Sequence, residues 1–229
     1  MRYHQFCPVS KAAEILGERW NILILRELLC GSRRFNDIQR GLGGISPSLL
    51  TRRLKELEAA GMLTRQIGTK GSAASYLPTA AGEALTPVIV AIGDWGMRYA
   101  RGDMTDDEMD LDLLMVDIQR RLVVEHIPGR KATLHFRFTD QEARLMNWWI
   151  RLDGDQRELC TERPAEGENL TIKCPATTMA QVWTGDLSLS EAQASRALSV
   201  VGDEALINRM RQWIGLSVFT PERRAERGH

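Results

Sequence analysis

The sequence predicts two domains of different fold class: a mainly helical domain with a small β-hairpin, followed by an α+β domain. In residues 1–61 the apolar residues recur every three or four positions, which is typical of helices. From residue 132 apolar and polar residues alternate, which is typical of a strand. Net charge divides in the same way. Residues 1–102 carry 14 Lys and Arg against 8 Asp and Glu, or +6, and residues 103–229 carry 16 against 22, or −6. At 229 residues the chain is long enough for two hydrophobic cores.

Three short helices are expected to open the first domain. Residues 8–16, 20–29 and 35–42 carry apolar side chains at helical spacing, and glycines stand at their ends. The second helix is the most apolar, so we expect it at the centre of the domain. The glycines at 41, 43 and 44 provide a tight turn from the third helix into a fourth. The third and fourth helices therefore form a helix-turn-helix unit.

The fourth helix is predicted from the segment ISPSLLTRRLKELEAAG at residues 45–61. Ser46 suits the N-cap, Pro47 the first helical position and Gly61 the C-terminus. Four leucines form one apolar stripe, at positions 49, 50, 54 and 57. The rest of its first half is polar and cationic. Taken alone, this pattern fits an ordinary surface helix as well as a helix that enters the major groove of DNA.

The segment after Gly61 helps to decide between a surface helix and a DNA-binding helix, because its apolar residues change from helical spacing to strand alternation. Residues 62–67 and 76–78 are typical of two strands, joined by the turn GTKGSAAS. A β-hairpin directly after a helix-turn-helix unit is the wing of a winged helix. Thr79 is then expected to begin a long helix that ends near Arg101. Its apolar surface is larger than so small a domain can bury, which predicts a homodimer.

Double-stranded DNA is the partner that this arrangement favours. On the exposed first turns of the fourth helix, Ser48, Thr51 and Arg52 are candidates for contact with base edges. Candidates for contact with phosphates or for support of the interface lie around them: Arg33, Arg34, Asn36, Ser46, Arg53, Lys55, Arg65 and, in the wing, Lys70 and Ser72. The alternative for any one of these charged residues is a solvated surface position.

Residues 6–101 resemble the HxlR type of winged-helix transcriptional regulator, a relative of the MarR regulators. The matching pieces are Cys7-Pro8, Gly17 to Trp20, Gly31 with Arg34-Phe35, Gly44-Ile45-Ser46, Leu50-Thr51, Leu54, Leu57-Glu58, Gly61-Met62 and Arg65. The resemblance implies a homodimer that binds an inverted-repeat operator. It also implies a possible redox or electrophile sensor at Cys7, since relatives often carry a cysteine there. The alternative is an unreactive, half-buried thiol.

The second domain is expected at residues 111–220, between an acidic linker at 103–110 and a flexible tail at 221–229. Its periodicity predicts a helix, four strands, and then helices that enclose a last short strand. The predicted ranges are 112–124 for the helix, 132–139, 145–152, 158–162 and 170–174 for the strands, 177–183, 190–197 and 203–213 for the later helices, and 198–201 for the last strand. This order predicts an antiparallel sheet covered by helices on one side.

Residues 110–218 resemble the sterol-carrier-protein type of lipid-binding domain. The resemblance is carried by Leu170-Thr171-Ile172, Met179 to Leu187, Glu191 to Ala194 and Leu198 to Asp203. It implies an apolar tunnel that accepts a hydrophobic small molecule. Candidate lining residues are Phe136, Phe138, Trp148, Trp149, Ile172, Trp183 and Trp213. The alternative is that these side chains fill the core of the domain.

Enzymatic, metal-dependent and membrane-spanning functions find no support in the motifs. The sequence has no Gly-x-Ser-x-Gly elbow, His-Glu-x-x-His, phosphate loop or dinucleotide fingerprint. Its four cysteines are far apart and lack metal-ligand spacing. We therefore expect no catalytic residues, no metal and no cofactor. No apolar run approaches the roughly 18 residues of a membrane span, which predicts a cytoplasmic protein.

Together these features predict a homodimeric transcriptional regulator, expected to repress, with a second domain that senses a hydrophobic molecule. The alternative is a redox- or electrophile-sensing regulator that acts through Cys7. In that case the second domain serves only dimerisation or protein interaction.

Overall fold

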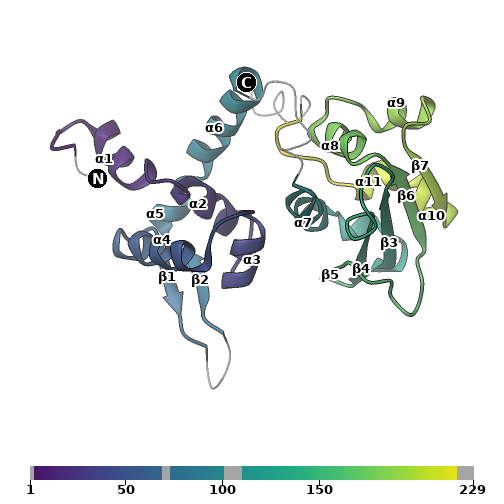
Figure 1. The fold of residues 1–229 in the computed structure, drawn as a ribbon, viewed down its shortest axis with the longest axis horizontal. Helices are drawn as coiled ribbons and strands as arrows, with labels where there is room; N and C mark the ends of the chain where they lie inside the picture. Colours follow the sequence, from purple (N-terminus) through teal and green to yellow (C-terminus); the bar gives the residue numbers. More distant parts are fainter. Residues whose placement is uncertain (1–2, 69–72, 101–109, 221–229) are drawn as a thin grey trace. The chain divides into compact units, whose positions relative to one another are not determined.

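A computed structural model describes residues 3–68, 73–100 and 110–220 of the chain (Figure 1). The chain divides into two compact units between Ala100 and Arg101, and each is described by itself. The wing residues Lys70 and Ser72 lie outside the described residues. So do nearly all of the acidic linker and the whole of the expected tail.

The first unit is a winged helix, as predicted. Its elements up to the wing are α1 (Pro8–Leu16), α2 (Asn21–Leu29), α3 (Phe35–Arg40), α4 (Pro47–Ala59), β1 (Leu63–Gln66) and β2 (Ser75–Pro78). The two strands pair antiparallel, with Leu63 opposite Pro78. The segment before α3 joins this hairpin: Arg34 forms a β-bridge with Ser75, and the Tyr76 amide donates to the Arg33 carbonyl at 2.8 Å. The wing is thereby fixed to the start of α3.

The helix expected over residues 79–101 is broken into two. α5 (Ala80–Glu83) ends after one turn, and α6 (Thr86–Tyr99) begins after a short interruption. Pro87 has no amide hydrogen to donate to the Glu83 carbonyl. The hydroxyl of Thr86 donates to that carbonyl instead, at 2.8 Å. The prediction of one continuous helix was therefore wrong at its proline.

A buried carboxylate fixes the turn between α2 and α3. Glu27 is fully buried, and its two carboxylate oxygens accept from Arg26 Nη2 at 2.9 Å and from Ser32 Oγ at 3.0 Å. Arg26 also donates to the carbonyl of Gly41 at 2.7 Å. A Cβ atom at position 41 would lie 2.0 Å from Glu27 Oε2, so any residue other than glycine there would displace the buried carboxylate. The end of α2 and the end of α3 are thus held by one polar cluster.

The second unit is a five-stranded sheet with helices on one face, which confirms the predicted α+β class (Figure 1). Its elements are α7 (Leu111–Arg121), two 3₁₀ turns (Val124–His126 and Pro128–Arg130), β3 (Lys131–Phe138), β4 (Asn147–Asp153), β5 (Gln156–Cys160), β6 (Leu170–Cys174), α8 (Ala176–Thr184), α9 (Leu189–Ala194), β7 (Ser199–Gly202), α10 (Glu204–Asn208) and α11 (Met210–Trp213). The strand order is β5-β4-β3-β6-β7.

The sheet is mixed, and the prediction that it is wholly antiparallel was wrong. β3 and β6 pair in parallel, with Leu134 opposite Leu170 and Phe138 opposite Cys174. The other three pairs are antiparallel. The connection over residues 161–169 returns the chain to the end of the sheet at which β3 begins. β6 therefore runs in the same direction as β3.

The helix expected over residues 203–213 is interrupted at Arg209, between α10 and α11. In a continuous helix the Leu206 carbonyl would accept from the Met210 amide. Here it accepts from the indole Nε1 of Trp213 at 2.8 Å. Trp213 is fully buried, so the core of the unit stabilises this break.

Strand β3 separates the unit into two environments. Ala132, Leu134, Phe136 and Phe138 face the core against the helices, and the intervening residues face the other side of the sheet. Across the described residues of both units, no helix combines the length and the apolar character needed to cross a membrane.

Candidate nucleic-acid interface

Helix α4 has one face in the core and one in solvent. The hydroxyl of Ser46 accepts from the Leu49 amide at 3.3 Å and caps the helix. Leu50, Leu54 and Leu57 are at most 1% exposed, and Leu49 is half-buried. The polar face predicted to meet DNA is largely open: Ser46, Ser48, Thr51, Arg52 and Lys55 are all exposed.

Arg53 does not belong to this open face, which corrects its assignment as a phosphate contact. Its side chain is buried between two carboxylates, 2.9 Å from Glu18 Oε2 and 2.6 Å from Glu56 Oε2. Burial alone would lower the pKa of the guanidinium, but Glu56 and Glu18 outweigh burial and raise that pKa. Arg53 therefore ties α4 to the connection between α1 and α2. Its guanidinium is not available to DNA.

Arg52, by contrast, keeps its guanidinium in solvent. The side chain is 63% exposed, and its nearest charged partner is Glu56, at 3.8 Å from Nε. An exposed pair at this distance contributes little to stability. Both terminal nitrogens of Arg52 can therefore bind another acceptor, such as a guanine edge in the major groove.

The two arginines before α3, Arg33 and Arg34, donate hydrogen bonds to backbone carbonyls of the protein. Arg33 Nη1 donates to the carbonyls of Leu28 and Ser32 at 2.5 and 3.0 Å. Arg34 donates to the carbonyl of Ala73 in the wing. Both side chains thus support the turn and the wing, and Arg34 remains exposed.

Two further candidates, Asn36 and Arg65, are exposed. The backbone amide of Arg65 donates to Glu58 at 3.2 Å, while its side chain faces solvent. Together with α4 they extend the exposed polar surface onto α3 and β1.

Sequence reasoning missed the two carboxylates that hold Arg53. Glu56 lies three residues after Arg53 on the same helix, a spacing that indicates a contact. Glu18 lies 35 residues earlier in the chain, and no local pattern points to it.

Exposed apolar side chains lie at the start of α1, just before it, and along α6 of the first unit. Phe6 is 99% exposed and Val9 76%. On α6, Val88, Ile92, Trp95 and Tyr99 are exposed at four- and three-residue intervals, which places them along one helical face. The rings of Trp95 and Tyr99 lie 5.8 Å apart. A surface of this kind marks a site of protein association.

Cys7 precedes α1, and the pKa of its thiol is shifted in the opposite direction from those of Cys160 and Cys174. The backbone amides of Ser10 and Val9, at the start of the helix, lower the pKa of its thiol. Burial raises the pKa of Cys160, and raises that of Cys174 to about 12. At neutral pH the thiolate is therefore favoured at Cys7 over these two sites.

Six of the seven residues expected to line a ligand tunnel form the core of the second unit. They are at most 5% exposed and belong to one apolar cluster: Phe136, Phe138, Trp148, Ile172, Trp183 and Trp213. Trp149 does not join them. It points to the opposite face of the sheet, where its ring stacks on His135 with centroids 4.7 Å apart. Alternation along β4 puts Trp148 and Trp149 on different sides.

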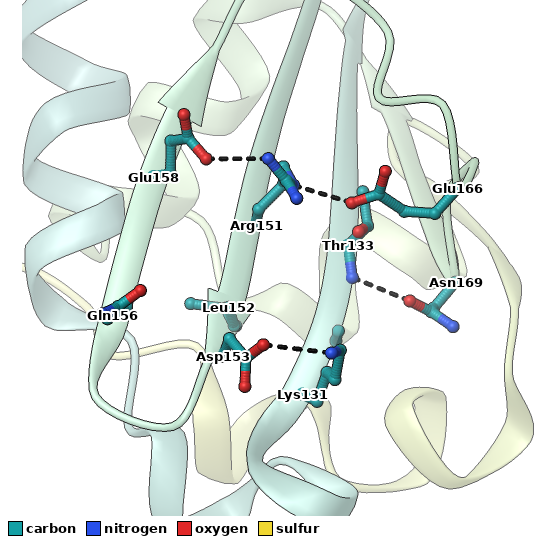
Figure 2. A pocket seen from close by; sticks show the side chains of 10 residues that line it. Lys131, Thr133, Arg151, Leu152, Asp153, Gln156, Glu158, Glu166 and Asn169 are labelled. Carbon is teal, nitrogen blue, oxygen red and sulfur yellow. Dashed lines mark hydrogen bonds and ion pairs between the residues drawn. The ribbon is translucent and has the colours of Figure 1, made fainter.

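A cleft of about 570 Å³ lies on that opposite face, and its lining is polar (Figure 2). Arg151 lies between two carboxylates, 2.9 Å from Glu158 and 2.8 Å from Glu166. Lys131 pairs with Asp153 at 3.0 Å. The charges that line the cleft are thus paired with one another, and the cleft does not have the lining of a lipid tunnel.

Within the described residues, no three side chains among His, Cys, Asp and Glu are grouped so that they could hold a metal ion.

A known family matches most of the first unit and a few residues beyond it. The model of the HxlR-like helix-turn-helix family matches residues 15–104. The HTH-type transcriptional regulator YvaP of Bacillus subtilis is 37% identical over 101 residues, which are 43% of this chain and 94% of that protein. Rv3095 of Mycobacterium tuberculosis, also an HTH-type transcriptional regulator, is 39% identical over 40% of this chain and 58% of its own length.

Among solved structures, the reduced form of the transcriptional regulator YodB from B. subtilis is 34% identical. The match covers 43% of this chain and 100% of YodB, with a TM-score of 0.38. The likeness of residues 110–218 to a sterol-carrier domain stays a prediction.

The different positions of two neighbouring arginines give a testable contrast. Replacing Arg53 by Ala is expected to lower the free energy of unfolding by about 1.5–3 kcal/mol, because the charge-assisted hydrogen bonds that its buried guanidinium makes to Glu18 and Glu56 are lost. The matched variant Arg52→Ala is expected to change it by less than about 0.5 kcal/mol, as for an exposed residue. Urea denaturation followed by circular dichroism measures both. Equal effects of the two substitutions would contradict the assignment.

Proposed function

This chain belongs, through its first unit, to the HxlR-like helix-turn-helix family of transcriptional regulators, and we propose that it binds an inverted-repeat operator as a homodimer and represses transcription there. The observation that carries the proposal is the division of α4. Leu50, Leu54 and Leu57 are buried, while Ser48, Thr51, Arg52 and Lys55 are exposed on the same helix. Base-edge contacts are assigned to Ser48, Thr51 and Arg52.

Phosphate contacts are assigned to the exposed cations around these residues. Lys55 lies on α4, Arg34 precedes α3 and Arg65 lies on β1. We extend the same role to Lys70 and Ser72 of the wing, while Arg53 is assigned the positioning of α4. Contacts of this kind fix the register of a protein on the duplex, and base contacts then provide specificity.

The proposed dimer is supported by the apolar faces of α1 and α6. Two copies related by a two-fold axis would place their α4 helices in successive major grooves, about 34–36 Å apart. The operator would then carry the same two-fold symmetry as the protein.

A steep dependence on salt tests DNA binding. If the dimer neutralises about six phosphates or more, its affinity should fall by about 10³-fold or more between about 50 and 200 mM salt. Lys55→Ala should weaken binding and make the salt dependence shallower, whereas Lys173→Ala, an exposed change in the second unit, should alter neither. Fluorescence anisotropy with a duplex recovered by genomic footprinting measures these quantities. Salt-insensitive binding would contradict the proposal.

Dimerisation is tested at the centre of the exposed face of α6. Trp95→Asp places a charge within the proposed interface and is expected to halve the molar mass in light scattering at micromolar concentration. Val201→Asp is the matched control, because Val201 is 70% exposed but lies on β7 of the second unit. A Trp95→Asp protein with the mass of the wild type would show that this face is not the interface.

Sensing of oxidants or electrophiles through Cys7 is a second candidate function. The lowered pKa of the Cys7 thiol favours it, since the thiolate is the reactive form. In this candidate, modification of Cys7 beside the exposed Phe6 and Val9 changes the association of α1 with the partner subunit. Binding to the operator then changes as well.

Alkylation kinetics test this candidate. At pH 7 iodoacetamide is expected to modify Cys7 faster than Cys160 or Cys174, since a lowered pKa leaves more thiolate at neutral pH. The rate at Cys7 should decline as the pH falls through that lowered pKa. Peptide mass spectrometry measures the rates site by site. If Cys7→Ser leaves the response of operator binding to diamide unchanged, Cys7 is not the sensor.

The proposal gives no role to a hydrophobic effector. Such a ligand would have to displace buried side chains such as Phe136, Trp183 and Trp213, which belong to one apolar cluster. The second unit is assigned instead to dimerisation or protein interaction.

A further inference from the structure

The hydroxyl of Thr51 is already engaged within α4. Its Oγ1 donates to the carbonyl of Pro47, four residues earlier, at 2.8 Å. Threonine often makes this hydrogen bond in helices, and the bond favours the side-chain rotamer that brings the hydroxyl close to the carbonyl. Thr51 is nevertheless exposed. The hydroxyl is directed at the helix backbone, so the γ-methyl is the part of the side chain left to meet a ligand.

The neighbours of Thr51 carry polar groups. Ser48 has its hydroxyl 3.3 Å from that of Ser46, and Arg52 extends a guanidinium into solvent. On this face of α4 the methyl of Thr51 is thus an apolar group with a hydrogen-bonding side chain to either side. A partner of matching chemistry would place a methyl group among hydrogen-bond donors and acceptors.

We propose that Thr51 recognises a thymine in each half-site of the operator, by contact between its γ-methyl and the C5-methyl of the base. This inference rests on the proposed function, because it assumes that α4 lies in the major groove. Thymine alone among the four bases presents a methyl group there, beside the acceptors and donors of its own and adjacent base pairs. The Thr51 hydroxyl has one hydrogen to donate, so donation to a base acceptor such as guanine O6 would first require loss of its bond to Pro47.

Replacement of thymine by deoxyuridine tests the contact without changing the protein. Full-length protein is first used to select a binding sequence from a random duplex library. Each thymine of the selected duplex is then replaced in turn by deoxyuridine, which lacks only the methyl group. At one thymine per half-site the affinity is expected to fall about four-fold, equivalent to about 0.8 kcal/mol for one buried methyl-sized group.

Two variants assign the effect to Thr51. Thr51→Ser removes the methyl and keeps the hydroxyl, so it should bind the thymine duplex about four-fold more weakly than wild type and no longer distinguish it from the deoxyuridine duplex. Thr51→Val keeps a methyl and should retain the distinction. Arg52→Ala is the matched control. It should weaken binding to both duplexes by the same factor and preserve their ratio.

The outcomes separate this inference from the proposed function. If the protein binds a selected sequence but no thymine responds to deoxyuridine, the contact is absent while DNA recognition stands. A response that persists in Thr51→Ser would assign the methyl contact to another side chain and overturn the inference. Failure to select any sequence would overturn the proposed function and the inference with it.

Discussion

The geometry of the DNA-binding unit depends on the burial of one charged group, the carboxylate of Glu27. An unpaired buried charge would cost several kcal/mol, so its surroundings must satisfy it. Arg26 and Ser32 do so, and Gly41 leaves the space that the carboxylate occupies. Because these residues belong to the end of α2, the following turn and the end of α3, the cluster fixes where the chain enters α4. The exposed side chains of α4 are positioned by an interaction in which none of them takes part.

A second charge cluster orients α4 itself. The leucine stripe holds the helix against the core, but apolar contacts are non-directional. Arg53, held between Glu18 and Glu56, adds a directional constraint on rotation about the helix axis. Two adjacent arginines thus have opposite roles. The guanidinium of Arg53 forms ion pairs within the protein, whereas that of Arg52 is exposed to solvent.

Local sequence signals predicted the helix-turn-helix and the wing because residues with defined conformational preferences mark the ends of their elements. Ser46 and Pro47 mark the start of α4, and the change of period after Gly61 marks the hairpin. Properties that depend on distant partners were not accessible in this way. The burial of Arg53 depends on Glu18, and the parallel pairing of β6 depends on the course of a connecting loop. Strand alternation predicts that Trp149 faces the side of the sheet away from the helices. Trp149 was nevertheless included among the lining residues of the expected tunnel, because it is a tryptophan next to Trp148.

Trp213, whose indole binds the Leu206 carbonyl at the break between α10 and α11, also affects the order in which the two units can fold during synthesis. β6 needs β7 as its outer neighbour, and the Leu206 carbonyl needs the indole of Trp213. The second unit therefore cannot complete its core until residue 213 has emerged from the ribosome. The first unit has all of its core residues by position 89. Since domains fold as units and the N-terminal one folds first during translation, the DNA-binding half can reach its native state while the ribosome is still adding the other half.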